Sequence, residues 1–175
     1  EPIIRNFVHV SKAYRKLDQW PRDSTEERFL YRWRVVQAGV LTPVLLQLFS
    51  APEGLLSVER RNRALALLES YLVRRLTCRL TSKDYNRLFL ELVGRLSNEL
   101  TCADEVVEQF LLEQDAHVRK WPSDLEFENA MVTLPIYGRV NQGRIRMLLE
   151  GLEEALRGDE AESQFGLVDH FADLA

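Results

Sequence analysis

The chain has 175 residues, of which 46 % are apolar and 29 % are charged, with only 8 glycines and 6 prolines. This composition excludes a disordered or collagen-like protein, and a chain of this length buries roughly two-thirds of its unfolded surface. The formal charge is −4, from 23 basic and 27 acidic residues, so the domain as a whole does not attract a nucleic-acid backbone. Any contact with nucleic acid therefore needs a local basic patch.

The sequence also bears on location and redox state. Its apolar stretches fall short of the ~20 residues that span a bilayer, and it does not open with a signal peptide, which predicts a cytoplasmic protein without membrane contact. Cys78 and Cys102 lack CxxC spacing, so we expect reduced, partly buried thiols. Neither Glu1 nor Ala175 reads as a natural terminus, and we expect a segment of a longer protein.

Helix start and stop signals recur along the chain, whereas the alternation typical of strands is almost absent. A capping box at residues 24–27 predicts a first helix that runs to Gly39. A second, short helix is expected over residues 42–48, with Thr42 as the N-cap and a proline after it. Gly54 ends this part of the chain.

The next two expected helices have the strongest patterns. The first runs from Ser57 to about Arg79, and a cap at residues 81–84 then opens the second. This second helix carries the clearest apolar stripe in the sequence: Tyr85, Leu88, Phe89, Leu92, Val93 and Leu96.

Three more helices follow. A cap at residues 101–104 precedes one with an apolar face, residues 123–126 cap a short one, and the last spans about residues 141–156 and ends at Gly158. The pattern predicts an all-α protein, an irregular multi-helix bundle of about seven to eight helices.

Local catalytic motifs are absent from the sequence. Neither GxxxxGK nor GxGxxG occurs, and His9, His117 and His170 stand too far apart for a local metal-binding pair. We therefore expect no cofactor and no metal in this chain. A site that converges from distant residues is an alternative, and it predicts a deep pocket with strongly perturbed carboxylates.

Two adjacent arginines, Arg74 and Arg75, interrupt the apolar stretch ESYLVRRLTCR. On a helical wheel centred on Leu72, Arg75 lies about 60° from the centre and Arg74 about 160°. We expect Arg75 at the core margin, paired with a carboxylate of a neighbouring helix, and Arg74 on the outer face. There it is either simply solvated or part of a basic surface for phosphates. The other members of that surface would be Arg63, Lys83 and Arg87.

The run LESYLVRRLTCRLTSKDYNRLFLELVGRL, residues 68–96, resembles the helical middle of GmrSD-type modification-dependent restriction endonucleases of bacterial phage defence. A tyrosine-leucine-x-arginine-arginine helix and a threonine-lysine-x-x-asparagine turn are typical of that family; here Ser82 is inserted in the turn. A second run, KWPSDLEFENAM, residues 120–131, is similar to the family's Trp-Pro-x-Asp-x-x-Phe step. The matching residues are Tyr71, Leu72, Arg74, Arg75, Lys83, Asn86, Trp121, Pro122, Asp124 and Phe127.

The resemblance implies that a ParB-like nucleotide-hydrolysing domain precedes this segment and that a His-Asn-His nuclease follows it. A nucleoside triphosphate and a divalent metal would serve those two domains of the parent protein. The Asp-Gly-Gln-Gln-Arg signature of the first is absent here, and the sequence stops about where the second would begin. The chain would then contain neither active site.

On this resemblance, residues 1–158 are a helical scaffold and residues 159–175 are an acidic connector toward the nuclease. Flanking domains of the same polypeptide are the expected partners, and the oligomeric state is open. Arg74 and Arg75 are expected to stabilise the scaffold through ion pairs. Contact with DNA through Arg74, Lys83 and Arg87 is a second role to test. The alternative function is a stand-alone helical module for protein–protein interaction.

Overall fold

The chain folds as helices and connecting turns. The computed structural model describes the following residues: 11, 14, 15, 17, 21, 24–52, 54–133 and 141–157. Within them lie seven α-helices, two short 3₁₀ helices and no strand, which confirms the predicted all-α multi-helix bundle.

Two compact units divide the chain, residues 1–134 and residues 135–175. This boundary falls inside the helical domain predicted for residues 1–158. The expected helix stop at Gly158 and the connector at residues 159–175 lie outside the described residues.

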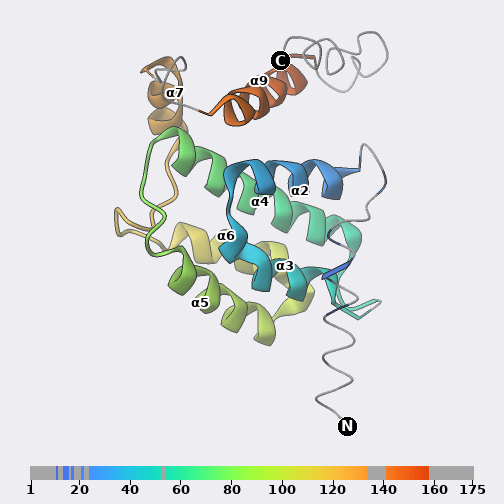
Figure 1. The fold of residues 1–175 in the computed structure, drawn as a ribbon. Helices are drawn as coiled ribbons and strands as arrows, with labels where there is room; N and C mark the ends of the chain where they lie inside the picture. The colour runs from blue at the N-terminus through green and yellow to red at the C-terminus, as the bar shows by residue number, and fades with distance from the viewer. Residues whose placement is uncertain are drawn as a thin grey trace. The chain divides into compact units, whose positions relative to one another are not determined.

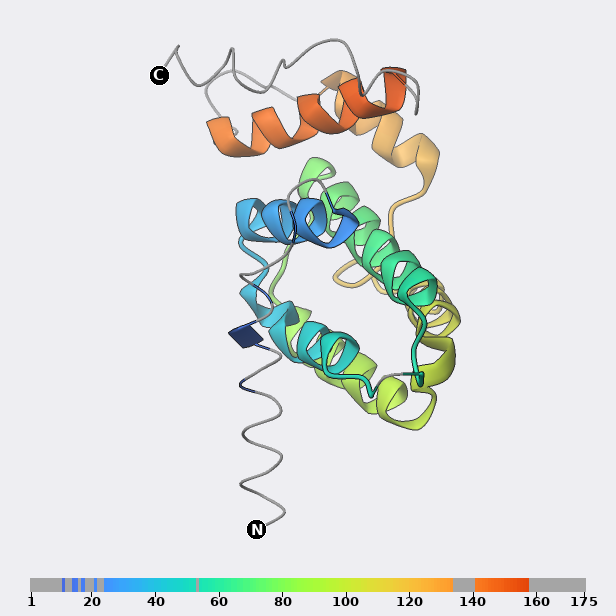
Figure 2. The same ribbon diagram turned by 90° about the vertical axis from the view of Figure 1, so that its right-hand side faces the viewer.

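In the first unit, α4 packs against α2 and α6, while α5 packs against α3 and α6 (Figure 1). Figure 2 shows the pair α2 and α4 on one side of this unit and the pair α3 and α5 on the other. The second unit contains α9. The helices span α2 Thr25–Val36, α3 Thr42–Phe49, α4 Val58–Thr77, α5 Tyr85–Asn98, α6 Ala103–Leu112, α7 Asp124–Thr133 and α9 Gln142–Arg157, with the 3₁₀ helices η1 Gly39–Leu41 and η2 Leu100–Cys102.

The core of the first unit is apolar and is built from helical stripes. The predicted stripe of α5 is confirmed, because all of its members are buried except Val93, which packs partly buried against the core. On α4 the buried positions recur every three or four residues, and burying each leucine side chain contributes about 1.5–3 kcal/mol. Arg75 lies on the same buried face and is as buried as the leucines that precede it.

The predicted N-terminal caps at Ser24 and Ser123 are confirmed, whereas the cap predicted at Thr42 is wrong. The caps predicted at residues 81–84 and 101–104 are also wrong, because α5 and α6 begin without a side-chain capping hydrogen bond. Ser24 Oγ accepts a hydrogen bond from the backbone N–H of Glu27 at 3.1 Å. Ser123 and Glu126 form a complete capping box, in which each side chain accepts a hydrogen bond from the other's backbone N–H. Thr42 is not an N-cap, because η1 leads directly into α3 and the Thr42 hydroxyl donates to the carbonyl of Gly39 instead.

The first helix ends earlier than predicted. α2 stops at Val36, and Gln37 adopts the left-handed conformation that usually favours glycine, with φ 62°. The backbone N–H groups of Gln37 and Ala38 donate to the carbonyls of Arg34 and Trp33, which satisfies the last turn. Gly39 therefore starts η1 rather than ending the helix.

α4 ends in the same way as α2. Arg79 has φ 55°, its backbone N–H donates to the carbonyl of Leu76, and the N–H of Leu80 donates to the carbonyl of Arg75. This six-residue Schellman motif turns the chain toward α5. The turn brings residues 81–84 close to the end of α4, where the candidate site lies.

Candidate functional site

A group of polar side chains gathers at the carboxyl end of α4, and we call it the arginine cluster. It contains Arg74, Arg75, Arg119, Tyr71 and Tyr85. Three different elements supply them: α4, the first turn of α5 and the connection between α6 and α7.

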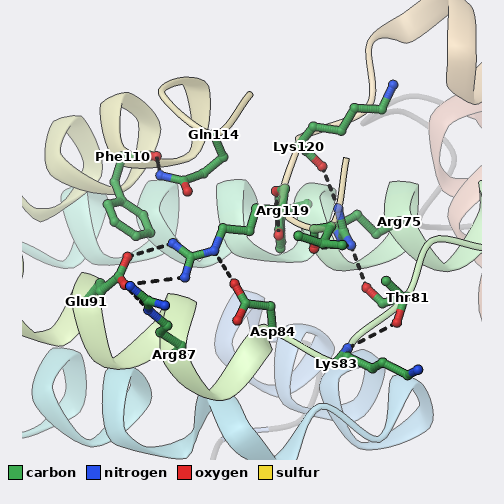
Figure 3. A network of polar contacts seen from close by, with 12 residues as sticks. Arg75, Thr81, Lys83, Asp84, Arg87, Glu91, Phe110, Gln114, Arg119 and Lys120 are labelled. Carbon is green, nitrogen blue, oxygen red and sulfur yellow. Dashed lines mark hydrogen bonds and ion pairs between the residues drawn. The ribbon is translucent and has the colours of Figure 1, made fainter. Parts of the chain in front are cut away.

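Arg75 is the centre of the arginine cluster and is fully buried. Its guanidinium donates to the backbone carbonyls of Lys120, Thr81 and Val118 at 2.8, 2.6 and 2.8 Å (Figure 3). A fourth hydrogen bond, from Nε, reaches the Tyr85 hydroxyl at 3.2 Å. Four of the five guanidinium N–H groups are therefore satisfied by oxygen atoms that carry no formal charge.

The predicted carboxylate partner of Arg75 is wrong. Its acceptors are carbonyls of two connecting segments, the turn after α4 and the chain between α6 and α7. Carbonyls outside helices lack the i→i−4 partner that a helix supplies, and burying them unpaired is costly. A planar guanidinium donates to several of them at once.

Two tyrosine rings enclose the Arg75 guanidinium. Its carbon lies 5.4 Å from the ring centroid of Tyr71 and 5.5 Å from that of Tyr85, distances typical of cation–π contacts. The Tyr71 hydroxyl donates to the carbonyl of Arg119 at 2.8 Å. Burial raises the pKa of both tyrosine hydroxyls above the ordinary value of 10, although the charge of Arg75 opposes the rise. Both hydroxyls remain neutral at physiological pH and are poor candidates for general bases.

Arg119 also fixes the connection between α6 and α7, in which it lies. Its guanidinium pairs with Asp84 and with Glu91, the latter at 2.7 Å, and Glu91 also accepts from Arg87 at 3.0 Å (Figure 3). The hydrogen bond from Arg119 is the main cause of the lowered pKa of Glu91. Arg119 thus pairs the α6–α7 connection with two acidic side chains of the α5 region.

Sequence reasoning missed Arg119. It lies in a segment without helical periodicity, and Asp84 is 35 positions away. Asp84 was expected only as part of a helix cap, yet it makes no capping hydrogen bond. Because neither residue has a local pattern, only the folded chain pairs them.

Arg74 lies on the outer side of α4, as predicted, and its side chain is 23 % exposed. It donates to Asp124 Oδ1 at 2.5 Å and to the carbonyl of Pro122 at 3.1 Å. Its guanidinium carbon also lies 5.4 Å from the ring centroid of Phe127. These contacts confirm the predicted ion pair and fasten the start of α7 to α4.

The remaining residues from the predicted motifs fall into two groups. Trp121 packs partly buried against the core, and Pro122 is buried. The Pro122 carbonyl accepts a hydrogen bond from Arg74, so the Trp-Pro step lies beside the arginine cluster. Asn86 is exposed on α5, and no hydrogen bond of its side chain occurs in the described residues. The motif residues that the structure brings together are Tyr71, Arg74, Arg75, Trp121, Pro122, Asp124 and Phe127.

The three candidate phosphate contacts have different surroundings. Arg74 is bound to Asp124, and Arg87, although 78 % exposed, is bound to Glu91. Lys83 is exposed, and among the described residues its side chain makes no hydrogen bond or ion pair; only its backbone N–H is engaged, with Thr81 Oγ1. Lys83 is the most available of the three.

Both cysteines lie in the described parts of the chain. Cys78 and Cys102 are free and half-buried, as predicted, and burial raises the pKa of Cys78. Within those parts, three or more histidine, cysteine, aspartate or glutamate side chains nowhere gather as a metal site, and no helix is long and apolar enough to cross a membrane.

A surface hollow of about 440 Å³ lies on α6. It is lined by Glu105, Glu108, Gln109, Leu112 and Glu113. All three of its acidic side chains are paired with arginines, namely Glu105 with Arg60, Glu108 with Arg63 and Glu113 with Arg95. The hollow therefore resembles a salt-bridged helix surface more than a catalytic pocket.

Comparison with known proteins adds no relative. No family model, no curated protein and no solved structure matches the chain. The arginine cluster must therefore be interpreted from its own geometry. The N–H groups of its arginines bind carbonyls and carboxylates of the same chain. Such an arrangement is typical of a structural contact between segments, which we call the joint.

Proposed function

We propose that this chain is a non-catalytic helical scaffold of a bacterial, GmrSD-type DNA restriction endonuclease, placed between a nucleotide-hydrolysing domain and a nuclease domain. The observation that carries the proposal is the contact between the two segments on which the resemblance rests. Arg74 of the first segment binds Pro122, Asp124 and Phe127 of the second. The two motifs stand about 50 positions apart, and their contact joins α4 to α7.

The chemistry of the arginine cluster supports a scaffold rather than an enzyme. Arg75 is buried and donates to backbone carbonyls, and raised pKa values keep the Tyr71 and Tyr85 hydroxyls neutral. The pKa values of the carboxylates Glu91 and Glu126 are lowered. A catalytic acid or base near neutral pH needs the opposite shift, toward 7. The joint instead fixes α7 and the α6–α7 connection against α4. A rigid contact of this kind suits a segment between two catalytic domains.

The catalytic part of the proposal is tested with the purified chain. It is incubated with modified and unmodified DNA duplexes, Mg²⁺ or Mn²⁺, and nucleoside triphosphates, and both cleavage and phosphate release are measured. We expect neither activity. An activity that remains constant per mole of chain through successive purification steps would contradict the scaffold role.

Contact with DNA is tested separately, by titrating a short duplex at several salt concentrations. If the scaffold contacts phosphate, Lys83→Ala should weaken binding. It should also reduce the slope of log K against log salt concentration by about one. Arg74→Ala alone is ambiguous, because it also removes the bond to Asp124. Asp124→Ala resolves this, because it removes the ion pair while Arg74 keeps its bond to the Pro122 carbonyl. Binding should strengthen more than in the control Glu128→Ala, which removes an exposed acidic charge of the same helix, if Arg74 can reach phosphate, and by the same amount if it cannot.

A further inference from the structure

α9 carries an apolar stripe that is exposed. Ile145, Leu149, Leu152 and Leu156 follow one another at steps of four, three and four residues. At about 100° per residue, all four fall within a band about 60° wide. Leu149 is 53 % exposed, Leu152 44 % and Leu156 87 %, whereas Ile145 is half-buried. This spacing is that of the a and d positions of a coiled coil.

The spacing of the stripe reads the same in both directions. When two copies of the helix lie antiparallel, Ile145 of one copy faces Leu156 of the other, and Leu149 faces Leu152. Every apolar residue of the stripe then meets an apolar residue of the second copy. A patch that matches itself in this way is the requirement for a two-fold symmetric interface.

The charges beside the stripe favour the antiparallel orientation. Arg146 and Glu153 lie on the same flank, about 100° and 80° from Ile145 on the wheel. In an antiparallel pair like flanks face each other, which puts Arg146 of each copy near Glu153 of the other. In a parallel pair that flank would face the opposite flank, where Arg144 and Leu148 lie and no acidic residue stands. Arg146 also donates through Nε to Glu150 within its own helix, at 2.7 Å.

We propose that α9 is a self-association surface whose partner is α9 of a second copy of this chain, packed antiparallel. The proposal is independent of any role in DNA restriction. The stripe has only four apolar residues, so the area it buries lies below the ~800 Å² per partner of a stable standard interface. The dimer is accordingly weak and forms reversibly with increasing concentration.

Sedimentation velocity of the 175-residue chain tests the proposal, over a range from about 5 µM to about 500 µM. The sedimentation coefficient should rise toward that of a dimer. The double variant Leu149→Glu/Leu152→Glu should stay monomeric throughout. Its control is Leu90→Glu, which changes a leucine of α5 that is 62 % exposed and should leave association unchanged. A chain that is monomeric at every concentration, or a dimer that survives the double variant, overturns the proposal.

Charge reversal tests the orientation without altering the apolar stripe. Arg146→Glu places a glutamate opposite Glu153 of the second copy, and we expect association about tenfold weaker. Adding Glu153→Arg restores opposite charges, and the wild-type association should return. Circular dichroism shows whether each variant keeps its helix content. A dimer that needs the leucines but ignores both charge changes would overturn the antiparallel arrangement.

Discussion

The interior between α3 and α5 and the arginine cluster at the end of α4 are both tightly buried, yet they are stabilised differently. Leu92 and Leu96 of α5 are inaccessible to solvent, and so is Arg75. Burial of the leucine side chains stabilises the fold in any orientation that fills the space. Burial of Arg75 stabilises the fold only where oxygen atoms lie at hydrogen-bonding positions around its guanidinium. Apolar burial therefore decides which helices pack together, whereas the arginine cluster decides where a non-helical connection runs.

Arg75→Met should give the largest loss. The methionine fills much of the space, but three carbonyls and the Tyr85 hydroxyl lose their partner in a buried setting. We expect the free energy of unfolding to fall by about 3–5 kcal/mol, measured by urea denaturation. Arg75→Lys keeps the charge and loses the planar fork, so it should be intermediate. A lysine variant as stable as wild type would show that geometry is unimportant here.

Leu92→Ala gives the apolar counterpart to that experiment. The side chain is fully buried, and its removal should cost about 3 kcal/mol from lost burial and the cavity left behind. Leu90→Ala, at an exposed position of the same helix, should cost less than about 0.5 kcal/mol.

Hydrogen exchange distinguishes the loss of stability caused by Leu92→Ala from that caused by Arg75→Lys. Leu92→Ala should lower the protection of amides along α5 and its neighbours. Arg75→Lys should lower protection first between residues 113 and 123, the connection whose carbonyls Arg75 binds. If both variants lose protection in the same amides, the two regions are not distinct.

The sequence predicts the first region far better than the second. The stripe of α5 and the buried face of α4 follow from helical periodicity, because a repeat of 3.6 residues is visible in the residue types themselves. The acceptors of Arg75 are backbone carbonyls, which every residue has, so no pattern marks them. Arg119 illustrates the same limit, since its partners Asp84 and Glu91 are set by tertiary packing. Arg74 and Asp124 were predictable only through the motifs that contain them.

The turn after α4 offers a change in the stabilising direction. Arg79 adopts a left-handed conformation that costs a residue with a Cβ atom about 1 kcal/mol, and its side chain makes no hydrogen bond or ion pair in the described residues. Arg79→Gly should therefore raise the free energy of unfolding by about 0.5–1 kcal/mol.

Two variants serve as controls for that turn. Gln37→Gly, at the equivalent position after α2, should be stabilising by a similar amount. Arg79→Ala keeps the Cβ atom and should bring no such gain. If alanine stabilises as much as glycine, relief of backbone strain is not the cause, and removal of an exposed positive charge is.

The smallest effect should come from the pH dependence of Glu91. Arg119 lowers its pKa below the ordinary value of 4.5, so its contribution to stability is complete above that pH and is lost as the pH falls through the lower folded value. Glu91→Gln should therefore be less stable than wild type at pH 6 and nearly equal at pH 3. The side chain is 41 % exposed, so the difference at pH 6 should shrink in 1 M salt. A gap that persists in salt and acid would mean that Glu91 acts through packing, and the α6–α7 connection would then be held mainly by the carbonyls that Arg75 binds.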